Sequence, residues 1–150
     1  AEVGGDAGAP DAALDAGDPT TPHQWAHILQ LEERTEDATL ALGPPDGRCA
    51  RIAPGGTVHV ELTPGARMET DGTEAPDVRV YVSEGSTSYR VDVGVERRQF
   101  TTIAQGLIAS TPLDVDQYGI SRFRYVRVKN RERRGEVCLD AIGTYAHPTP

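Results

Sequence analysis

The sequence is poor in aromatic residues, in cysteine and in long apolar runs, and each shortage excludes something. Aromatic residues make up 5% of the 150 positions, so few side chains are available to stack against a sugar ring. Cysteine occurs twice and without the C-x-x-C spacing of a zinc site. No stretch of about 18 apolar residues is present, so no segment is predicted to cross a membrane as a helix.

Signatures of catalysis and of nucleic-acid binding are also missing. The sequence contains neither a G-x-S-x-G nucleophile motif nor an H-E-x-x-H zinc motif. It carries 23 acidic and 15 basic residues, a net charge of −8, which argues against a basic surface for DNA or RNA. A catalytic pair of carboxylates, as in a glycosidase, is an alternative that the sequence leaves open, because acidic residues are numerous. The sequence favours a protein that is not an enzyme and does not bind nucleic acid.

Much of the negative charge lies at the N-terminus, in residues 1–22. This segment has no basic residue, and its acidic residues are Glu2, Asp6, Asp11, Asp15 and Asp18. Such a segment, rich in Ala, Gly, Asp, Pro and Thr, buries too little apolar surface to offset the entropy lost on ordering it. We expect a disordered, extended acidic tether over 1–22 and a single folded domain over 23–147.

Short alternating segments after the tether predict an all-β fold. Between Thr57 and Leu62, for example, aliphatic residues alternate with His59 and Glu61. The segments expected to be strands are 57–62, 77–83, 89–95, 100–104, 123–129 and 136–145. Turn signals such as Pro54-Gly55-Gly56 separate strands, and residues 23–34 fit either a helix or a first strand. Short strands without intervening helices indicate an antiparallel β-sandwich.

The two cysteines, Cys49 and Cys138, lie near opposite ends of the expected folded domain. A disulfide between them would join the first and last strands and would indicate an oxidising, extracytoplasmic compartment. The alternative is that both are unpaired, buried cysteines that pack as small apolar residues.

Seven segments follow one another in a specific order: ALGPPDG (41–47), GGTVHVEL (55–62), DVRVYVSEG (77–85), YRVDVGV (89–95), FTTIAQG (100–106), RYVRVKN (124–130) and EVCLDAIGTY (136–145). In this order they resemble the galactose-binding-like jelly roll of the discoidin and coagulation-factor C-domain superfamily, in its bacterial cell-surface form. The resemblance covers about residues 36–146 and implies a jelly-roll sandwich of about eight strands. This fold carries many binding roles, so the resemblance does not specify a ligand.

The resemblance also implies a structural cation, Ca²⁺, where the early loop meets the closing strand. Calcium takes about six to eight oxygen ligands, and the expected protein ligands are Asp37, Thr39, Asp46 and Asp140. Asp140 is the clearest of them, because it interrupts an apolar strand and an unpaired buried carboxylate is costly. The alternatives are an outward-facing Asp140 and ordinary turn roles for Asp37 and Asp46.

Basic residues cluster in 122–134 of this acidic protein, and Arg122, Arg124 and Arg127 belong to the cluster. As a functional site the cluster would bind an anion on an acidic glycan, a lipopolysaccharide phosphate or an acidic protein. A solvated strand face is the alternative. Tyr81, expected to face outward beside Arg79, is the aromatic residue best placed to stack on a sugar.

We therefore expect a non-catalytic, calcium-stabilised binding or adhesion module that recognises a glycan or another cell-surface component. The alternatives are a structural lipoprotein subunit that contacts partner proteins in an envelope complex or surface filament, and an accessory domain of a polysaccharide-active enzyme. The tether resembles those that follow the lipid-modified cysteine of bacterial envelope lipoproteins, which implies an anchor before Ala1; a fragment that begins within a linker is the other interpretation. The expected location is the bacterial cell surface, the periplasm or the outer membrane.

Overall fold

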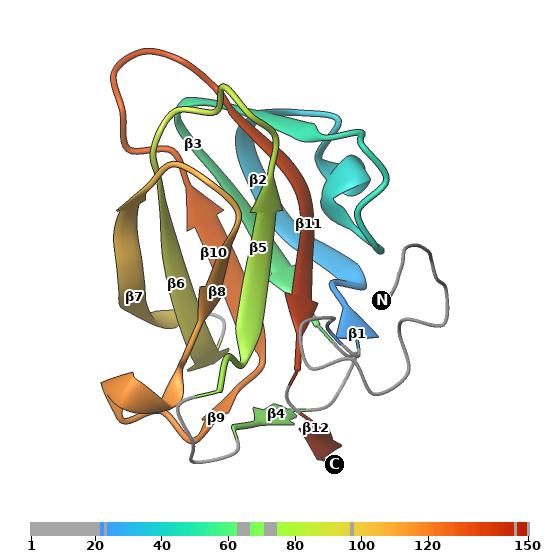
Figure 1. The fold of residues 1–150 in the computed structure, drawn as a ribbon, viewed down its shortest axis with the longest axis vertical. Coiled ribbons are helices and arrows are strands. Elements are labelled where there is room, and N and C mark those ends of the chain that lie inside the picture. Colours follow the sequence, from blue (N-terminus) through green and yellow to red (C-terminus); the bar gives the residue numbers. More distant parts are fainter. Residues whose placement is uncertain are drawn as a thin grey trace, which may run out of the picture.

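The computed structural model describes residues 22, 24–62, 67–70, 75–96, 98–145 and 147–149. Except for Pro22, the predicted acidic tether lies outside these residues. Antiparallel strands make up most of the described part, which confirms the all-β prediction (Figure 1). The strands are β1 (Gln24–Trp25), β2 (Ile28–Glu36), β3 (Ala50–Glu61), β4 (Arg67–Glu69), β5 (Val78–Val82), β6 (Tyr89–Glu96), β7 (Gln99–Leu107), β8 (Thr111–Leu113), β9 (Arg122–Phe123), β10 (Tyr125–Lys129), β11 (Val137–Thr144) and β12 (His147–Thr149). Two short 3-10 helices are η2 (Ala38–Ala41) and η3 (Asp116–Tyr118).

Most strands belong to one nine-stranded sheet that is curled and nearly closed. Its order is β7-β6-β10-β3-β11-β5-β8, with β2 paired to β3 and β1 paired to β11. The two ends of this order, β7 and β8, are in contact, so the sheet approaches a barrel. A small sheet of β12, β4 and β9 lies at one end of the barrel (Figure 1).

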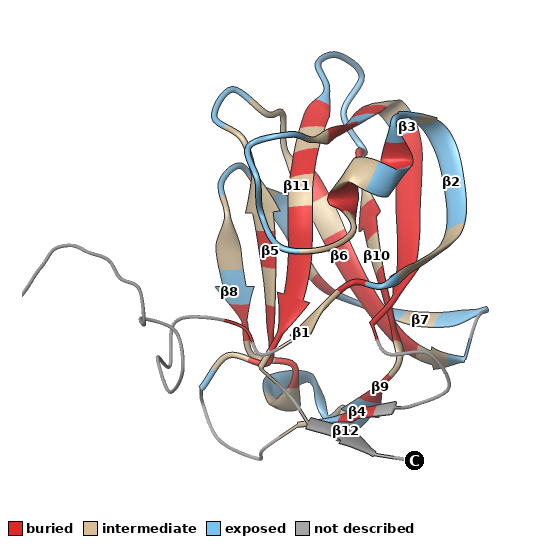
Figure 2. Cartoon of the chain, turned by 90° about the vertical axis from the view of Figure 1, so that its right-hand side faces the viewer, coloured by how far each residue is buried: buried red, intermediate tan, exposed pale blue. Residues whose placement is uncertain are grey.

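Alternating aliphatic side chains fill the interior, as the sequence pattern predicts. The buried valines on the inner face are Val58, Val60, Val78, Val80, Val91, Val93, Val126 and Val128. Burying such a side chain contributes about 1.5–3 kcal/mol relative to leaving it exposed. Figure 2 shows buried residues along β3, β10 and β11, whereas much of β2 and β7 is exposed.

The predicted turn at Pro54-Gly55-Gly56 is wrong, because these residues lie inside β3. Gly55 has a φ of 80°, which favours glycine. The N–H of Gly55 donates to the Asn130 carbonyl at 2.9 Å, and the Asn130 N–H donates to the Gly56 carbonyl at 3.0 Å. The first residues of β3 pair with β11 and its last residues pair with β10. The two glycines therefore bend one long strand around the curl instead of separating two strands.

The N-terminal part of the folded region is extended rather than helical. Gln24–Trp25 and Ile28–Glu36 are strands, and β2 pairs along β3, so the helical interpretation of 23–34 is wrong. The strands β4, β8 and β12 were not predicted, and β9 was predicted only at Phe123, because two or three residues are too few to show a period. Within the described ranges, no helix has the length and apolar character needed to cross a membrane.

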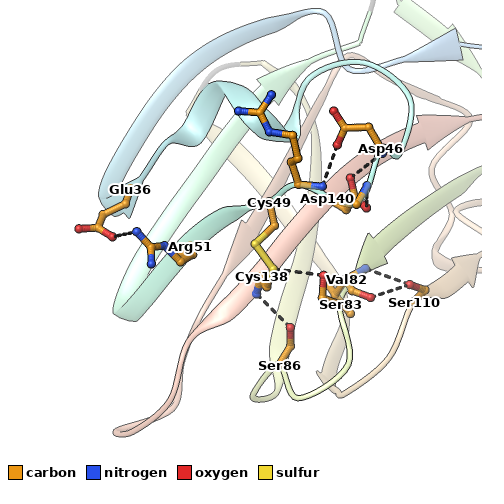
Figure 3. Close-up of a disulfide and its surroundings, with 12 residues drawn as sticks. Glu36, Asp46, Cys49, Arg51, Val82, Ser83, Ser86, Ser110, Cys138 and Asp140 are labelled. Atoms are coloured by element: carbon orange, nitrogen blue, oxygen red, sulfur yellow. Dashed lines mark hydrogen bonds and ion pairs between the residues drawn. A yellow bond between two sulfur atoms is a disulfide. The ribbon is translucent and has the colours of Figure 1, made fainter.

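The predicted disulfide between Cys49 and Cys138 is present, with the two Cα atoms 5.2 Å apart (Figure 3). Cys49 directly precedes β3, and Cys138 lies on β11 opposite the start of that strand. The bridge therefore joins segments that already pair. A disulfide suggests an oxidising, extracytoplasmic compartment.

Candidate functional site

Asp140 on β11 contacts the early loop of residues 42–49 through main-chain hydrogen bonds. Its Oδ1 accepts the N–H of Asp46 at 3.0 Å, and its Oδ2 accepts the N–H of Gly47 at 3.1 Å (Figure 3). The Asp46 carboxylate in turn accepts the N–H of Arg48 at 2.9 Å. The Asp140 carboxylate and the disulfide thus tie the early loop to β11 at two neighbouring points.

These contacts place the four predicted calcium ligands in two different settings. Asp46 and Asp140 lie close together, but both oxygens of the Asp140 carboxylate accept main-chain N–H groups. The main-chain carbonyls of Asp37 and Thr39 accept N–H groups within η2. These hydrogen bonds occupy part of the acceptor capacity of these oxygens, and calcium binding by this set stays a prediction.

A different acidic group is brought together by the fold. One carboxylate oxygen from each of Asp77, Asp114 and Asp116 lies within 4.8 Å of the others, an arrangement that could hold a metal ion. The Asp77 Oδ2 also accepts the N–H of Val115 at 2.9 Å, so the group anchors the start of η3 as well. The D-x-D spacing of Asp114 and Asp116 was visible in the sequence, but Asp77 joins them only through the pairing of β5 with β8.

Calcium is expected to raise the melting temperature of the protein, because an ion that binds only the folded state stabilises it. If calcium binds at the site predicted from the sequence, Asp140→Ala should abolish this rise. If calcium binds between Asp77, Asp114 and Asp116, Asp114→Ala should abolish it instead. Thermal melts of the wild type and both variants, with calcium and with a chelator, measure the effect. A wild-type melting temperature that is the same in calcium and in chelator would contradict stabilisation by calcium.

A groove of about 430 Å³ lies on the outer face of the curled sheet, over β2, β3, β10 and the β6–β7 hairpin. This volume falls in the range of about 300–1,000 Å³ that is usual for small-ligand sites. The residues that line the groove are Gln30, Leu31, Glu33, Thr57, His59, Arg98, Phe100, Arg127 and Lys129. We refer to it below as the outer groove.

The β6–β7 hairpin forms one wall of the outer groove by folding back over the sheet. A Cβ on Gly94 of β6 would lie 2.4 Å from the Gln99 carbonyl oxygen, so the close approach needs glycine. The Phe100 ring of β7 reaches the His59 ring of β3 at 4.9 Å between centroids, although β6 and β10 lie between these strands in the sheet. His59 points outward as predicted, but only 6% of it is exposed because the hairpin covers it.

Two buried carboxylates on the outer face hold arginines in place. Asp92 of β6 has a fully buried side chain and pairs with Arg127 at 2.7 Å and with Arg90 at 3.0 Å. Glu61 of β3 pairs with Arg124 at 2.5 Å, and this hydrogen bond raises the pKa of Arg124. These two carboxylates therefore fix the guanidinium groups of Arg90, Arg124 and Arg127 on the outer face.

The structure does not bring the five predicted ligand-binding residues together at one site. Arg127 lines the outer groove. Arg124 pairs with Glu61, and Arg122 on β9 pairs with the exposed Glu69 at 3.8 Å. Arg79 and Tyr81 lie on β5, away from the groove lining.

Tyr81 belongs to an aromatic cluster on the other half of the sheet. Its ring centroid lies 5.6 Å from that of Trp25, and the Arg79 guanidinium carbon lies 5.1 Å from it. Burial raises the pKa of the Tyr81 phenol, and Arg79 partly offsets the rise. Trp25 lies directly on Gly143, where a Cβ would come within 2.8 Å of the indole. These contacts pack β1 onto β11 beside a second cavity of about 600 Å³ that Trp25 and Leu42 help to line.

The sequence matches no protein-family model, and a search of curated proteins finds no match either. The chain is accordingly described by its structure, as an all-β antiparallel domain with a curled, nearly closed sheet and one disulfide.

Proposed function

We propose that the protein is a non-catalytic, extracytoplasmic carbohydrate-binding module whose ligand lies in the outer groove. The observation that carries the proposal is that apolar and hydrogen-bonding side chains line the same cavity. Leu31, 48% exposed, and Phe100 supply apolar surface, and cationic side chains supply donors. A sugar ring presents the matching surfaces, because its C–H faces pack on apolar groups while its hydroxyls accept hydrogen bonds.

The arrangement of acidic residues supports binding rather than hydrolysis. A glycosidase of the usual kind needs two carboxyl groups that face the scissile bond. Among the described residues that line the outer groove, Glu33 is the single carboxylate. Asp92 and Glu61 lie buried nearby, but both are held by arginines.

The fold supports the same proposal. The strands β7, β6, β10, β3 and β2 form one half of the curled sheet, and β1, β11, β5 and β8 form the other half. We propose that the halves correspond to the two layers of a galactose-binding-like jelly roll, as the sequence resemblance implies, with structural Ca²⁺ as an accessory. The disulfide supports a location at the cell surface, in the periplasm or on an outer-membrane lipoprotein.

Leu31→Asn is expected to weaken glycan binding about five- to tenfold, since it removes apolar contact worth about 1 kcal/mol or slightly more. A glycan array with neutral and acidic members, probed with the full chain, identifies the ligand, and calorimetry measures the loss. The matched control is Ile108→Asn, which changes an equally apolar residue that is 70% exposed and does not line the groove. Retention of no glycan by the wild type, or equal losses in the two variants, would contradict the proposal.

A further inference from the structure

We propose that the ligand of the outer groove is an anionic glycan, and that its carboxylate or sulfate groups bind Arg98, Arg127 and Lys129. This inference rests on the proposed carbohydrate-binding function and specifies the class of glycan. Three cationic residues line the groove, against Glu33 as the one carboxylate among the described lining residues.

Two of these cations have no partner of their own among the described residues. Arg98 lies in the turn between β6 and β7, and Lys129 lies at the end of β10. Neither forms an ion pair or a side-chain hydrogen bond within the described part of the chain. Because both line the same cavity, an anion placed there would meet positive charge from two segments far apart in sequence.

Arg127 is the preorganised member of the set. Its Nε donates to the buried Asp92 carboxylate at 2.7 Å, and its guanidinium carbon lies 4.2 Å from the Phe100 ring centroid. Within the described structure, its two terminal nitrogens have no hydrogen-bond partner. Because its Nε and its guanidinium plane are already held, Arg127 can donate from its two terminal nitrogens to a carboxylate or sulfate. Binding then costs little additional side-chain entropy.

The rest of the basic cluster is arranged differently. Arg124 is paired with the buried Glu61, and Arg122 forms a long, exposed ion pair with Glu69 at 3.8 Å. Arg131 and Arg133 lie in the exposed loop of residues 131–136, where solvent screens a charge. Arg127 and Lys129 are instead half-buried beside the apolar walls formed by Leu31 and Phe100, where electrostatic attraction is stronger than in open solvent. Arg98 is exposed and adds its charge from the turn between β6 and β7. The net charge of −8 works against indiscriminate adsorption of polyanions and favours capture at this one place.

The test compares an oligogalacturonate with its methyl ester, which has the same sugar backbone without the charges. We expect the full chain to bind the free acid at least about tenfold more tightly than the ester, as for loss of charge-assisted hydrogen bonds. The double variant Arg98→Gln/Lys129→Gln should lose about 10- to 100-fold in affinity for the acid. The matched double variant Arg131→Gln/Arg133→Gln removes the same charge from the exposed loop and should stay within about twofold.

A second measurement needs no variant, because Lys129 is the only lysine in the sequence. Its acetylation by an amine-reactive reagent, followed by peptide mass spectrometry, reports on whether the groove is occupied. A saturating acidic oligosaccharide should slow the modification about tenfold or more, whereas the methyl ester at the same concentration should slow it much less. A sulfated oligosaccharide, tested in parallel, shows whether sulfate or carboxylate is the preferred anion.

The results separate this inference from the proposed function. If the acid and the ester bind equally and Leu31→Asn weakens both, the groove binds carbohydrate and the inference of an anionic ligand is overturned. If the two arginine-containing double variants lose affinity equally, binding is diffuse electrostatic attraction and the inference is also overturned. If the array retains no glycan, the carbohydrate-binding function itself fails.

Discussion

Replacing both Cys49 and Cys138 by serine is expected to lower the free energy of unfolding by about 3–5 kcal/mol. The two residues are 89 positions apart, and cross-linking so long a loop removes much conformational entropy from the unfolded chain. The Asp140 contacts and the pairing of β3 with β11 remain, so the variant should fold with a lower stability. Urea unfolding of the full chain, followed by the fluorescence of its single tryptophan, measures the difference.

The wild type treated with a reducing agent provides the control for this result. Reduction should shift the wild-type unfolding midpoint to that of the serine variant and should leave the variant itself unchanged. The intact mass of the untreated wild type should be lower than that of the reduced protein by two hydrogens. An unfolding midpoint that does not respond to reduction, in a protein whose mass shows the bridge, would contradict the stabilising role of the disulfide.

Asp92→Ala is expected to destabilise the protein by about 3–5 kcal/mol, because it leaves two partly buried guanidinium groups without their buried counterion. The Asp92 side chain is fully buried, and the side chains of its partners Arg90 and Arg127 are 14% and 29% exposed. The substitution also frees Arg127 from the position in which it lines the outer groove, so affinity for a glycan should fall in parallel. Denaturant unfolding and calorimetry measure the two effects.

The matched control is the exposed ion pair between Arg51 and Glu36, whose side chains are 50% and 68% exposed. Glu36→Gln breaks this pair in solvent and should cost less than about 1 kcal/mol. Asp92→Asn should fall between the two, since the amide oxygen still accepts the hydrogen bond from Thr102. If Asp92→Ala cost no more than Glu36→Gln, the buried network would not be what holds this face of the sheet together.

Local patterns in the sequence predicted the parts of the fold that depend on neighbouring residues. Alternation of valines placed Val58 and Val60 in the interior, because a strand turns successive side chains to opposite faces. The positions of Cys49 and Cys138 predicted the disulfide. The prediction of a turn at Gly55 was wrong, because a glycine-rich bend inside a strand has the same composition as a glycine-rich turn between strands.

The outer groove could not be predicted in the same way, because it depends on strand register and on one folded-back hairpin. His59 was expected to face outward, and the rings of Phe100 and Tyr125 pack against it there and bury it. The pairing of Arg127 with Asp92 follows from their being opposite each other on β10 and β6. No pattern within either segment specifies that register, so the sequence showed a basic cluster without showing which cations are neutralised.

The most direct test of the account is to map the ligand onto the protein by NMR. Amide chemical shifts of the full chain, recorded while an acidic oligosaccharide is added, report which residues the ligand contacts. We predict that the largest changes fall on Leu31, Arg98, Phe100 and Lys129, around the outer groove. Changes centred on Trp25 and Tyr81, with these four amides unmoved, would contradict the assignment of the groove as the binding face.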